Sequence, residues 1–308
     1  MRKKISIIGA GSVGATAVHR IASKELGDVV LVDIVEGLPQ GKGLDLSQAG
    51  PIEGFDARIL GTNSYEETAN SDLVIIAAGS PRKPGMSRLD LLKTNERVVR
   101  AVVEQVVARS PQAQLLVVTN PLDVMAYLVK AVSGFPKERV YGMAGVLDSG
   151  RLRTFIAEEL DVSVEDVQAL VLGEHGDGML LLPRYSAVGG IPIKELLPEA
   201  RIQTLIEHTR GAASEILSLV KTASTLYAPG AAIAQMAEAV LRDKGRILPC
   251  SAYLEGEYGL SDLYLGVPVK LGAGGIEKII ELELTQEERE ALEHSAERVR
   301  EGIRQLQI

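Results

Sequence analysis

Hydrophobic positions in the first half of the chain fall into short continuous runs, and stretches with apolar residues at helical spacing separate these runs. Short runs of β-forming residues that end in glycine or a polar residue are typical of strands in a buried parallel sheet. They predict strands at 5–9, 29–33, 57–61, 73–78, 115–119 and 139–143. This alternation predicts a doubly wound parallel sheet, an α/β fold that binds ligands beyond the carboxyl ends of its strands. Residues 9–11, Gly79 and 119–120 should therefore line one crevice.

The pattern changes after residue 147, where strands and helices no longer alternate. Helical patterns occupy 148–160, 199–223 and 231–241, and β-like runs follow at 247–254, 267–271 and 276–280. Helices grouped before antiparallel strands indicate a second, α+β domain. We therefore expect two domains, 1–145 and 146–308, that share a fixed interface.

The last helix has a clear predicted start and a clear predicted inner face. Thr285 and Glu288 have the spacing of a capping box, which marks a helix N-terminus. The apolar stripe of this segment consists of Leu292, Ala296, Val299, Ile303 and Leu306. We expect this stripe to pack on the body of the protein.

The first predicted strand runs into a glycine-rich segment, ISIIGAGSVG. Gly9, Gly11 and Gly14 have the G-x-G-x-x-G spacing that suits a diphosphate: the first permits a tight turn, the second a close approach of the ligand, and the third close packing of the following helix. The predicted cofactor contacts are Gly9, Ala10, Gly11, Ser12, Val13 and Gly14. Asp33 ends the second strand, where a carboxylate can bond both ribose hydroxyls and repel a 2′-phosphate. This arrangement favours NAD over NADP.

Two other interpretations of this segment need to be weighed. A glycine-rich turn with no ligand is one of them, but the strand before it, the helix after it and Asp33 at the expected distance favour the dinucleotide site. The other is a secretory signal peptide, because Arg2, Lys3 and Lys4 precede an apolar stretch. Three glycines at phosphate-loop spacing interrupt that stretch, which favours a strand.

Composition narrows the class of protein. The 308 residues are 46% hydrophobic and 24% charged, which is ordinary for a globular protein, and no stretch approaches the ~20 apolar residues of a membrane span. A net charge of −8 argues against a nucleic-acid partner, which requires a basic face. Cys250 is the only cysteine, so neither an intrachain disulfide nor a cysteine zinc cluster can form, and no metal site is expected. We expect a cytoplasmic protein.

One of the four histidines stands out. His19, His208 and His294 lie in helical or charged surroundings and are interpreted as surface or packing residues, whereas His175 lies between two glycines after a β-like run. Asp148 and Arg151 project from one face of a predicted helix start. A carboxylate bonded to one ring nitrogen of His175 would leave the other to exchange a proton with a substrate oxygen. A purely structural Asp–His pair fits the spacing equally well.

Two further features have both a functional and a structural interpretation. The segment 78–92 carries Arg82, Lys83 and Arg88 among prolines and a glycine, which suits either a lid that closes over an anionic substrate or a solvated basic loop. Asn95 falls on the apolar face of the next helix, where a polar side chain needs a partner. That partner is either the cofactor or nearby backbone.

Six segments in register now point to a family. They are GAGSVG, the strand that ends at Asp33, RKPGMSR, TNPLDVM, GMAGVLDSGRLR and GEHGD. In this order and at these intervals the sequence resembles the lactate and malate dehydrogenase superfamily, most closely its lactate-dehydrogenase-like group of malate dehydrogenases. The resemblance covers essentially the full chain.

The resemblance implies a role for each candidate residue. His175 accepts the hydroxyl proton, and Asp148 orients its ring. Arg151 binds the carboxylate next to the reacting carbon, Arg88 polarises the C2 oxygen, and Asn120 bonds the substrate oxygen and helps to place the nicotinamide. Further cofactor contacts are Asn95 and Val118. Arg82 stands where the lactate enzymes have glutamine, so it matches the second carboxylate of a dicarboxylate substrate.

We therefore expect an NAD-dependent oxidoreductase that acts on malate and oxaloacetate, and the family implies a homodimer or homotetramer. A lactate or other 2-hydroxyacid dehydrogenase is the alternative, which Arg82 disfavours. An NAD-dependent glycosidase would have a Cys and His metal site, and Cys250 has no histidine nearby in sequence. A non-enzymatic NAD-binding protein is expected to lack His175, Asp148 or Arg151.

Overall fold

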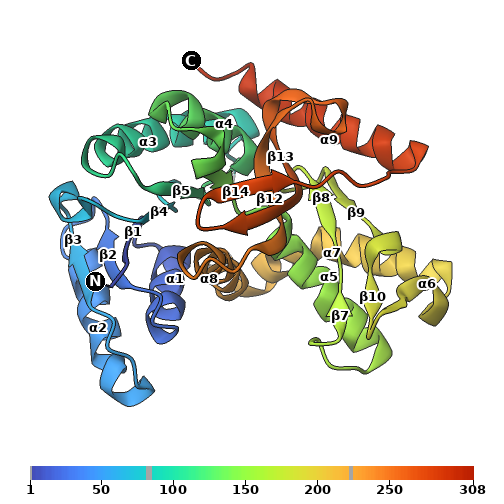
Figure 1. Ribbon diagram of the computed structural model, residues 1–308, viewed down its shortest axis with the longest axis horizontal. Coiled ribbons are helices and arrows are strands. Elements are labelled where there is room, and N and C mark those ends of the chain that lie inside the picture. The colour runs from blue at the N-terminus through green and yellow to red at the C-terminus, as the bar shows by residue number, and fades with distance from the viewer. Residues whose placement is uncertain (1, 81–84, 222–224) are drawn as a thin grey trace.

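The structure is a computed structural model that describes residues 2–80, 85–221 and 225–308. Its centre is one mixed sheet, whose parallel part comes from the first half of the chain (Figure 1). The parallel strands are β1 (Lys4–Ile8), β2 (Asp28–Val32), β3 (Ile59–Thr62), β4 (Leu73–Ile76), β5 (Gln114–Val117) and β6 (Val140–Gly142). They stand in the order β3-β2-β1-β4-β5-β6, so the strand order reverses between β1 and β4. The predicted doubly wound sheet is confirmed.

Helices connect the parallel strands and bury them. They are α1 (Ser12–Ser23), α2 (Leu38–Glu53), α3 (Arg88–Arg109) and α4 (Leu122–Ser133), and α5 (Gly145–Leu160) follows the last parallel strand. In Figure 1, α3 and α4 lie on one side of the strands and α1 on the other. Ile7, Leu31, Ile75 and Leu116 have no exposed surface, as expected for a parallel sheet that is covered on both faces.

The second half of the chain contributes antiparallel strands and further helices. The strands are β7 (Val167–Gln168), β8 (Val171–Gly173), β9 (Met179–Leu181), β10 (Ala187–Val188), β11 (Ile191–Pro192), β12 (Arg246–Glu255), β13 (Ser261–Gly272) and β14 (Gly275–Ile279). The helices are α6 (Ile193–Leu196), α7 (Glu199–Val220), α8 (Tyr227–Leu241) and α9 (Gln286–Ile303). Short 3-10 helices lie at Tyr65–Thr68, Lys137–Arg139, Pro183–Tyr185 and Glu257–Gly259.

The antiparallel strands extend the parallel sheet. β12, β13, β8 and β9 follow β6 in the strand order, while β7, β10 and β11 form a small separate sheet. The junction is the pairing of Ser251 in β12 with Gly142 in β6. A Cβ on Gly142 would lie 2.9 Å from the Ser251 Cβ, so only glycine permits this close contact. The hydrophobic pattern did not predict that the two halves share one sheet.

Several boundaries differ from the prediction for identifiable reasons. α8 begins before residue 231 because Pro229 lies in its first turn, where the missing N–H of proline costs nothing. The predicted strand begins at residue 267 because Gly266 interrupts the apolar run. In the structure Gly266 pairs with Ser251 and with Gly173, so β13 begins earlier, at Ser261. α7 ends at Val220, and residues 222–223 of its prediction lie outside the described residues.

The last helix follows its prediction closely. Thr285 and Glu288 form the capping box: the Glu288 N–H donates to Thr285 Oγ1 at 3.2 Å, and the Thr285 N–H donates to Glu288 Oε2 at 2.8 Å. Leu292, Ala296 and Val299 are buried. α9 therefore packs on the body, where it lies beside α4. None of the helices in the described ranges has the length and apolarity that crossing a lipid bilayer requires.

Two glycines explain how β1 and α1 approach one another. Gly9 has a φ of +111°, and a Cβ there would lie 2.7 Å from the Ala78 nitrogen. A Cβ on Gly14 would lie 1.9 Å from the Gly9 carbonyl oxygen. Since backbone atoms cannot move aside as a flexible side chain can, a larger residue at either position would push the helix away from the strand.

Substitution of Gly14 by alanine should therefore destabilise the fold. We expect the free energy of unfolding to fall by about 1–3 kcal/mol, the usual cost of overpacking. Gly11→Ala is the matched control, because a Cβ on Gly11 meets nothing within 4 Å, and its cost should stay below about 1 kcal/mol. Urea denaturation of the two variants measures the difference, and equal stabilities would contradict this account of the packing.

Candidate active site

The glycine loop leaves an open space in front of a helix N-terminus. α1 has Gly11 as its N-cap, and no side chain of the described residues caps it. A Cβ on Gly11 would point into open space, with no atom within 4 Å. The N–H groups of the first turn and the helix dipole both favour an anion at this position. The geometry is compatible with the diphosphate contact predicted for residues 9–14.

Asp33 faces the glycine loop from the end of β2. Its Oδ2 accepts the Ala10 N–H at 2.7 Å, and its Oδ1 accepts the Val35 N–H at 3.0 Å. On the other side of Ala10, Lys42 Nζ of α2 donates to the Ala10 carbonyl at 2.6 Å. Two opposite charges therefore hold the backbone of Ala10. Lys42 was not identified from the sequence, because the hydrophobic pattern of α2 is weak and nothing there indicates a contact with the glycine loop.

The carboxyl ends of β1, β4 and β5 meet as predicted. Thr119 Oγ1 donates to the Ala78 carbonyl at 2.7 Å, and a Cβ on Gly79 would lie 2.6 Å from Thr119 Cγ2. The Gly9 contact with Ala78 brings the glycine loop to the same place. These three strand ends therefore line one crevice.

Asn95 cross-links two of these strand ends. Its side chain is 1% exposed. Its Nδ2 donates to the carbonyls of Asn120 at 2.7 Å and Ser80 at 3.2 Å, and its Oδ1 accepts the Ser80 N–H at 2.7 Å. Of the two partners considered for Asn95, the structure shows the nearby backbone. A contact of Asn95 with the cofactor stays a prediction. Val118 and Asn120 lie at the end of β5, where Val118 is partly buried and Asn120 exposed.

His175 lies in the turn between β8 and β9, 27 residues after Asp148 of α5. Its Nδ1 is 2.7 Å from Asp148 Oδ2, and Arg151 Nη1 donates to Asp148 Oδ1 at 3.0 Å. The side chains of Asp148, Arg151 and His175 are 2%, 11% and 13% exposed. The predicted contact between His175 and Asp148, and the common face of Asp148 and Arg151, are confirmed. Their chemical roles stay predictions.

The surroundings of His175 favour its protonated form. Burial alone would lower the pKa of the imidazole, but the Asp148 carboxylate raises it through its charge and its hydrogen bond, and the Asp123 carboxylate adds to this. The Arg151 guanidinium acts in the opposite direction. The net effect is a pKa of His175 above the ordinary value, so the ring can hold and release a proton near neutral pH.

The other histidines and Cys250 have no part in this site. His19 pairs with Glu53 at 2.8 Å, and His208 stacks on Phe155 with ring centroids 3.8 Å apart. His294 is exposed on α9. Cys250 is fully buried within β12. The interpretation of the three histidines as surface or packing residues is confirmed.

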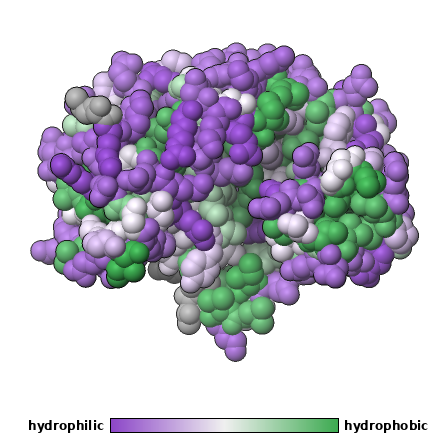
Figure 2. All heavy atoms as spheres, turned by 60° about the horizontal axis from the view of Figure 1, so that its bottom comes forward, coloured by the Kyte–Doolittle hydropathy of each residue, from purple (hydrophilic) through white to green (hydrophobic). Residues whose placement is uncertain are grey.

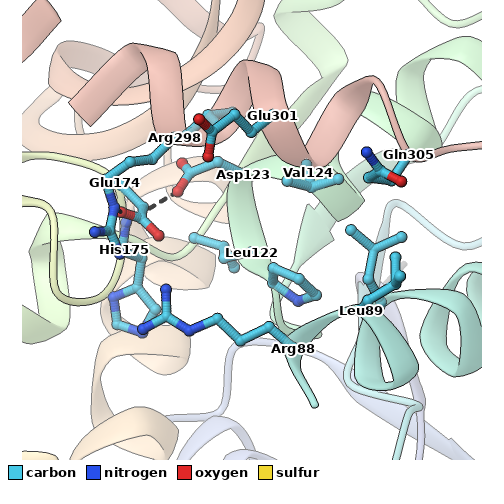
Figure 3. A pocket seen from close by; sticks show the side chains of 14 residues that line it. Arg88, Leu89, Leu122, Asp123, Val124, Glu174, His175, Arg298, Glu301 and Gln305 are labelled. Atoms are coloured by element: carbon cyan, nitrogen blue, oxygen red, sulfur yellow. Dashed lines mark hydrogen bonds and ion pairs between the residues drawn. The ribbon is translucent and has the colours of Figure 1, made fainter. Parts of the chain in front are cut away.

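A cavity of about 510 Å³ opens beside His175 (Figure 3). It is lined by residues of α3, α4, the His175 turn and α9, among them Arg88, Asp123, His175 and Arg298. Figure 3 shows the His175 ring and the guanidinium end of Arg88 on the same side of this cavity. Arg88 forms an ion pair with Asp177, and both side chains are more than half exposed. The predicted lid residue Arg82 lies outside the described residues.

Asp123, Asp177 and Ser251 were also missed in the sequence. Asp123 and Asp177 fall within the segments TNPLDVM and GEHGD that carry the resemblance, but neither was assigned a role. Ser251 lies in the middle of an apolar strand, where a single serine gives little signal. The contacts that link them appear only in three dimensions.

Comparison with known proteins agrees with this geometry. The model of the lactate/malate dehydrogenase NAD-binding domain matches residues 3–142, and the model of the α/β C-terminal domain of the same family matches residues 145–307. A malate dehydrogenase of Roseiflexus castenholzii is 59% identical over 306 residues, which cover 99% of each chain.

Solved structures give the same result. The malate dehydrogenase of Salinibacter ruber is 54% identical, with a TM-score of 0.95 and coverage of 99% of this chain and 97% of that one. A lactate dehydrogenase of Cryptosporidium parvum, in complex with lactic acid and nicotinamide adenine dinucleotide, is 41% identical, also with a TM-score of 0.95, and covers 99% and 98% of the two chains. Both family models and the full-length relatives show that this chain belongs to the lactate/malate dehydrogenase family.

Proposed function

We propose that this protein is an NAD-dependent malate dehydrogenase, which interconverts (S)-malate and oxaloacetate. The observation that carries the proposal is the buried Asp148 carboxylate, held 2.7 Å from the His175 ring and 3.0 Å from the Arg151 guanidinium beside a cavity. A base with a fixed orientation next to a carboxylate-binding cation suits proton exchange with a 2-hydroxy acid. The 59% identity to a malate dehydrogenase supports the same substrate.

The residues of the crevice fit the NAD that the family implies. The open space at Gly11 and the uncapped start of α1 suit the diphosphate. Each oxygen of the Asp33 carboxylate accepts one backbone N–H and has a further lone pair for a ribose hydroxyl. The neighbouring Ile34 side chain is 91% exposed and offers an apolar surface to the adenine ring.

His175 performs the proton transfer in this proposal, while bound NAD supplies the nicotinamide that takes or gives the hydride. Because Nδ1 faces Asp148, the ring presents Nε2 to the substrate hydroxyl. In malate oxidation, neutral His175 accepts the hydroxyl proton at Nε2, and the Asp148 carboxylate stabilises the resulting imidazolium. In oxaloacetate reduction the same proton returns to the C2 oxygen.

Two arginines of the described residues handle the substrate. A guanidinium has five N–H donors, so Arg151 can hold Asp148 and a substrate carboxylate at once. Arg88 polarises the C2 oxygen as negative charge develops on it. Its pair with Asp177 does not prevent this, because both side chains are more than half exposed and such a pair contributes about 0–1 kcal/mol. Asn120 is proposed to bond the same oxygen and to place the nicotinamide.

Arg82 determines the choice of substrate in this proposal. A cation on the lid matches the second carboxylate of oxaloacetate, whereas pyruvate would leave the charge desolvated and without a partner. The lactate alternative is therefore disfavoured. The assignment of Arg82 rests on the resemblance alone, since this residue lies outside the described residues.

The organisation of the chain is also proposed in finer detail. We place the boundary between an NAD-binding domain and a catalytic domain at residues 145/146, which the separate matches at 3–142 and 145–307 support.

We propose a homodimer or homotetramer. Figure 2 shows hydrophobic side chains gathered in patches on a mainly hydrophilic face, and the end of α7 exposes Ile216, Leu217, Leu219 and Val220. A cytoplasmic location suits the single buried Cys250.

Replacement of Arg82 by glutamine tests the substrate assignment. The unaltered enzyme should prefer oxaloacetate over pyruvate by roughly a thousandfold in kcat/KM, since an unpaired buried charge costs several kcal/mol. Arg82→Gln should erode that preference, and Lys83→Gln, which removes a neighbouring charge, should retain it. NADH oxidation with the two substrates provides the measurement. Faster turnover of pyruvate by the unaltered enzyme would favour the lactate alternative.

The two directions of the reaction should have opposite pH dependences. Oxaloacetate reduction needs imidazolium, so its kcat/KM should fall as pH rises through the pKa of His175, whereas malate oxidation should rise. Because the pKa of His175 is raised, both midpoints should lie above about 6.5. Asp148→Asn removes the stabilising charge and should move both midpoints to lower pH. Profiles of equal sign in the two directions would exclude His175 as the proton carrier.

Asp33 should control the choice between NAD and NADP. Asp33→Ser removes the charge that repels a 2′-phosphate, so the ratio of kcat/KM for NADPH to that for NADH should rise roughly tenfold or more. Asp45→Ser, an exposed position on α2, makes the same change in net charge elsewhere and should leave the ratio unchanged. If the two variants behave alike, the Asp33 carboxylate does not face the ribose.

A further inference from the structure

Asp123 links the turn that carries His175 to the sheet. It lies in the first turn of α4, directly beyond the end of β5, and is 2% exposed. Its Oδ2 accepts the backbone N–H of His175 at 2.9 Å, and its Oδ1 accepts the Ser251 hydroxyl at 2.6 Å. Ser251 is the residue at which β12 pairs with β6. One carboxylate therefore connects three segments that are far apart in the sequence.

The His175 turn needs such an anchor because its backbone is intrinsically free. Gly173 and Gly176, on either side, have φ angles of +82° and +154°, which glycine adopts without a steric penalty. Because glycine also adopts many other conformations, these two angles are not fixed by the residues themselves. Two hydrogen bonds restrict this freedom. The Glu174 N–H donates to Ser295 Oγ of α9 at 2.6 Å, and the next N–H, that of His175, donates to Asp123.

The charge of Asp123 also acts on the His175 ring. Burial raises the pKa of Asp123 to about 6, and its hydrogen bonds with Ser251 and His175 limit this rise. The start of α4 favours the anion as well, since a helix N-terminus attracts negative charge. As a carboxylate, Asp123 contributes to the raised pKa of His175 together with Asp148, while Arg151 opposes it. Arg88 and Glu174 line the same cavity (Figure 3).

We propose that Asp123 is a positioning residue for His175: it fixes the backbone of the His175 turn against the end of the parallel sheet, while Asp148 fixes the ring. This inference rests on the proton-transfer role proposed for His175. Two carboxylates from the first turns of α4 and α5 thus hold one histidine at its backbone and at its ring. Since α4 follows β5, whose end lines the cofactor crevice, this anchor keeps His175 at a constant distance from that crevice.

Asp123→Ala and Asp123→Asn distinguish the effect of the Asp123 hydrogen bonds from the effect of its negative charge. Alanine removes both contacts, so the rate of oxaloacetate reduction should fall roughly 10- to 100-fold, as small misplacements of reacting groups do, with NADH binding unchanged. Asparagine can still accept the His175 N–H and donate to Ser251, so its rate should stay close to that of the unaltered enzyme. It lacks the charge, however, and its pH midpoint for oxaloacetate reduction should move to lower pH. Ser251→Ala, which keeps the His175 contact, should lose less activity than Asp123→Ala.

Pre-steady-state NADH oxidation, NADH fluorescence titration and the pH profile provide these values, and His175→Asn is measured beside them. If His175→Asn is inactive but Asp123→Ala reacts at the unaltered rate, the positioning role is wrong. The same holds if Asp123→Asn, which keeps both contacts, loses as much rate as is expected of the alanine variant, a result that remains informative even if the alanine variant fails to fold. An unmoved pH midpoint of Asp123→Asn would contradict the effect of its charge on the His175 ring. If His175→Asn keeps full activity, the proton-transfer role itself fails, independently of Asp123.

Discussion

The Asp148 carboxylate is almost completely removed from solvent, with 2% of its side chain exposed, and an unpaired charge in such a place is unfavourable by several kcal/mol. It is stable there because one oxygen meets Arg151 and the other meets His175. In the proposed mechanism the same two contacts serve the chemistry: the first places a guanidinium for a substrate carboxylate, and the second fixes the ring and its tautomer. Loss of either partner would leave a buried charge and a misdirected side chain.

The fold supplies this arrangement by extending a parallel sheet with antiparallel strands. Ser251 joins β12 to β6 through its pairing with Gly142, and Gly266 joins β13 to β8 through Gly173. The second junction places the His175 turn, which follows β8, next to the start of α5. Small residues at both junctions allow the strands to approach. The site is therefore held mainly by strands and helix starts, which are the rigid parts of the molecule.

Much of the fold and of the candidate site could be predicted from the sequence, and there are physical reasons why the remainder could not. The glycine loop, Asp33 and the strands of the parallel sheet have strong local signals of spacing and residue type. The contact between Asp148 and His175 was implied by the resemblance to the family rather than by spacing. α2 contains several glycines and Pro51, so it shows no clear helical pattern. Asp123 and Ser251 act through contacts between distant segments, which spacing does not reveal. The two alternatives for Asn95 needed coordinates, which show bonds to backbone.

The interaction between Asp148 and His175 can be measured directly by NMR, from the pH titration of the His175 ring protons in the free enzyme. The spectrum of His175→Asn assigns the resonance among the four histidines. The account predicts a midpoint for the unaltered protein above the ordinary value of about 6.5, and a clearly lower midpoint for Asp148→Asn. A midpoint at or below the ordinary value, or one that Asp148→Asn leaves in place, would contradict the claim that this carboxylate sets the proton affinity of His175.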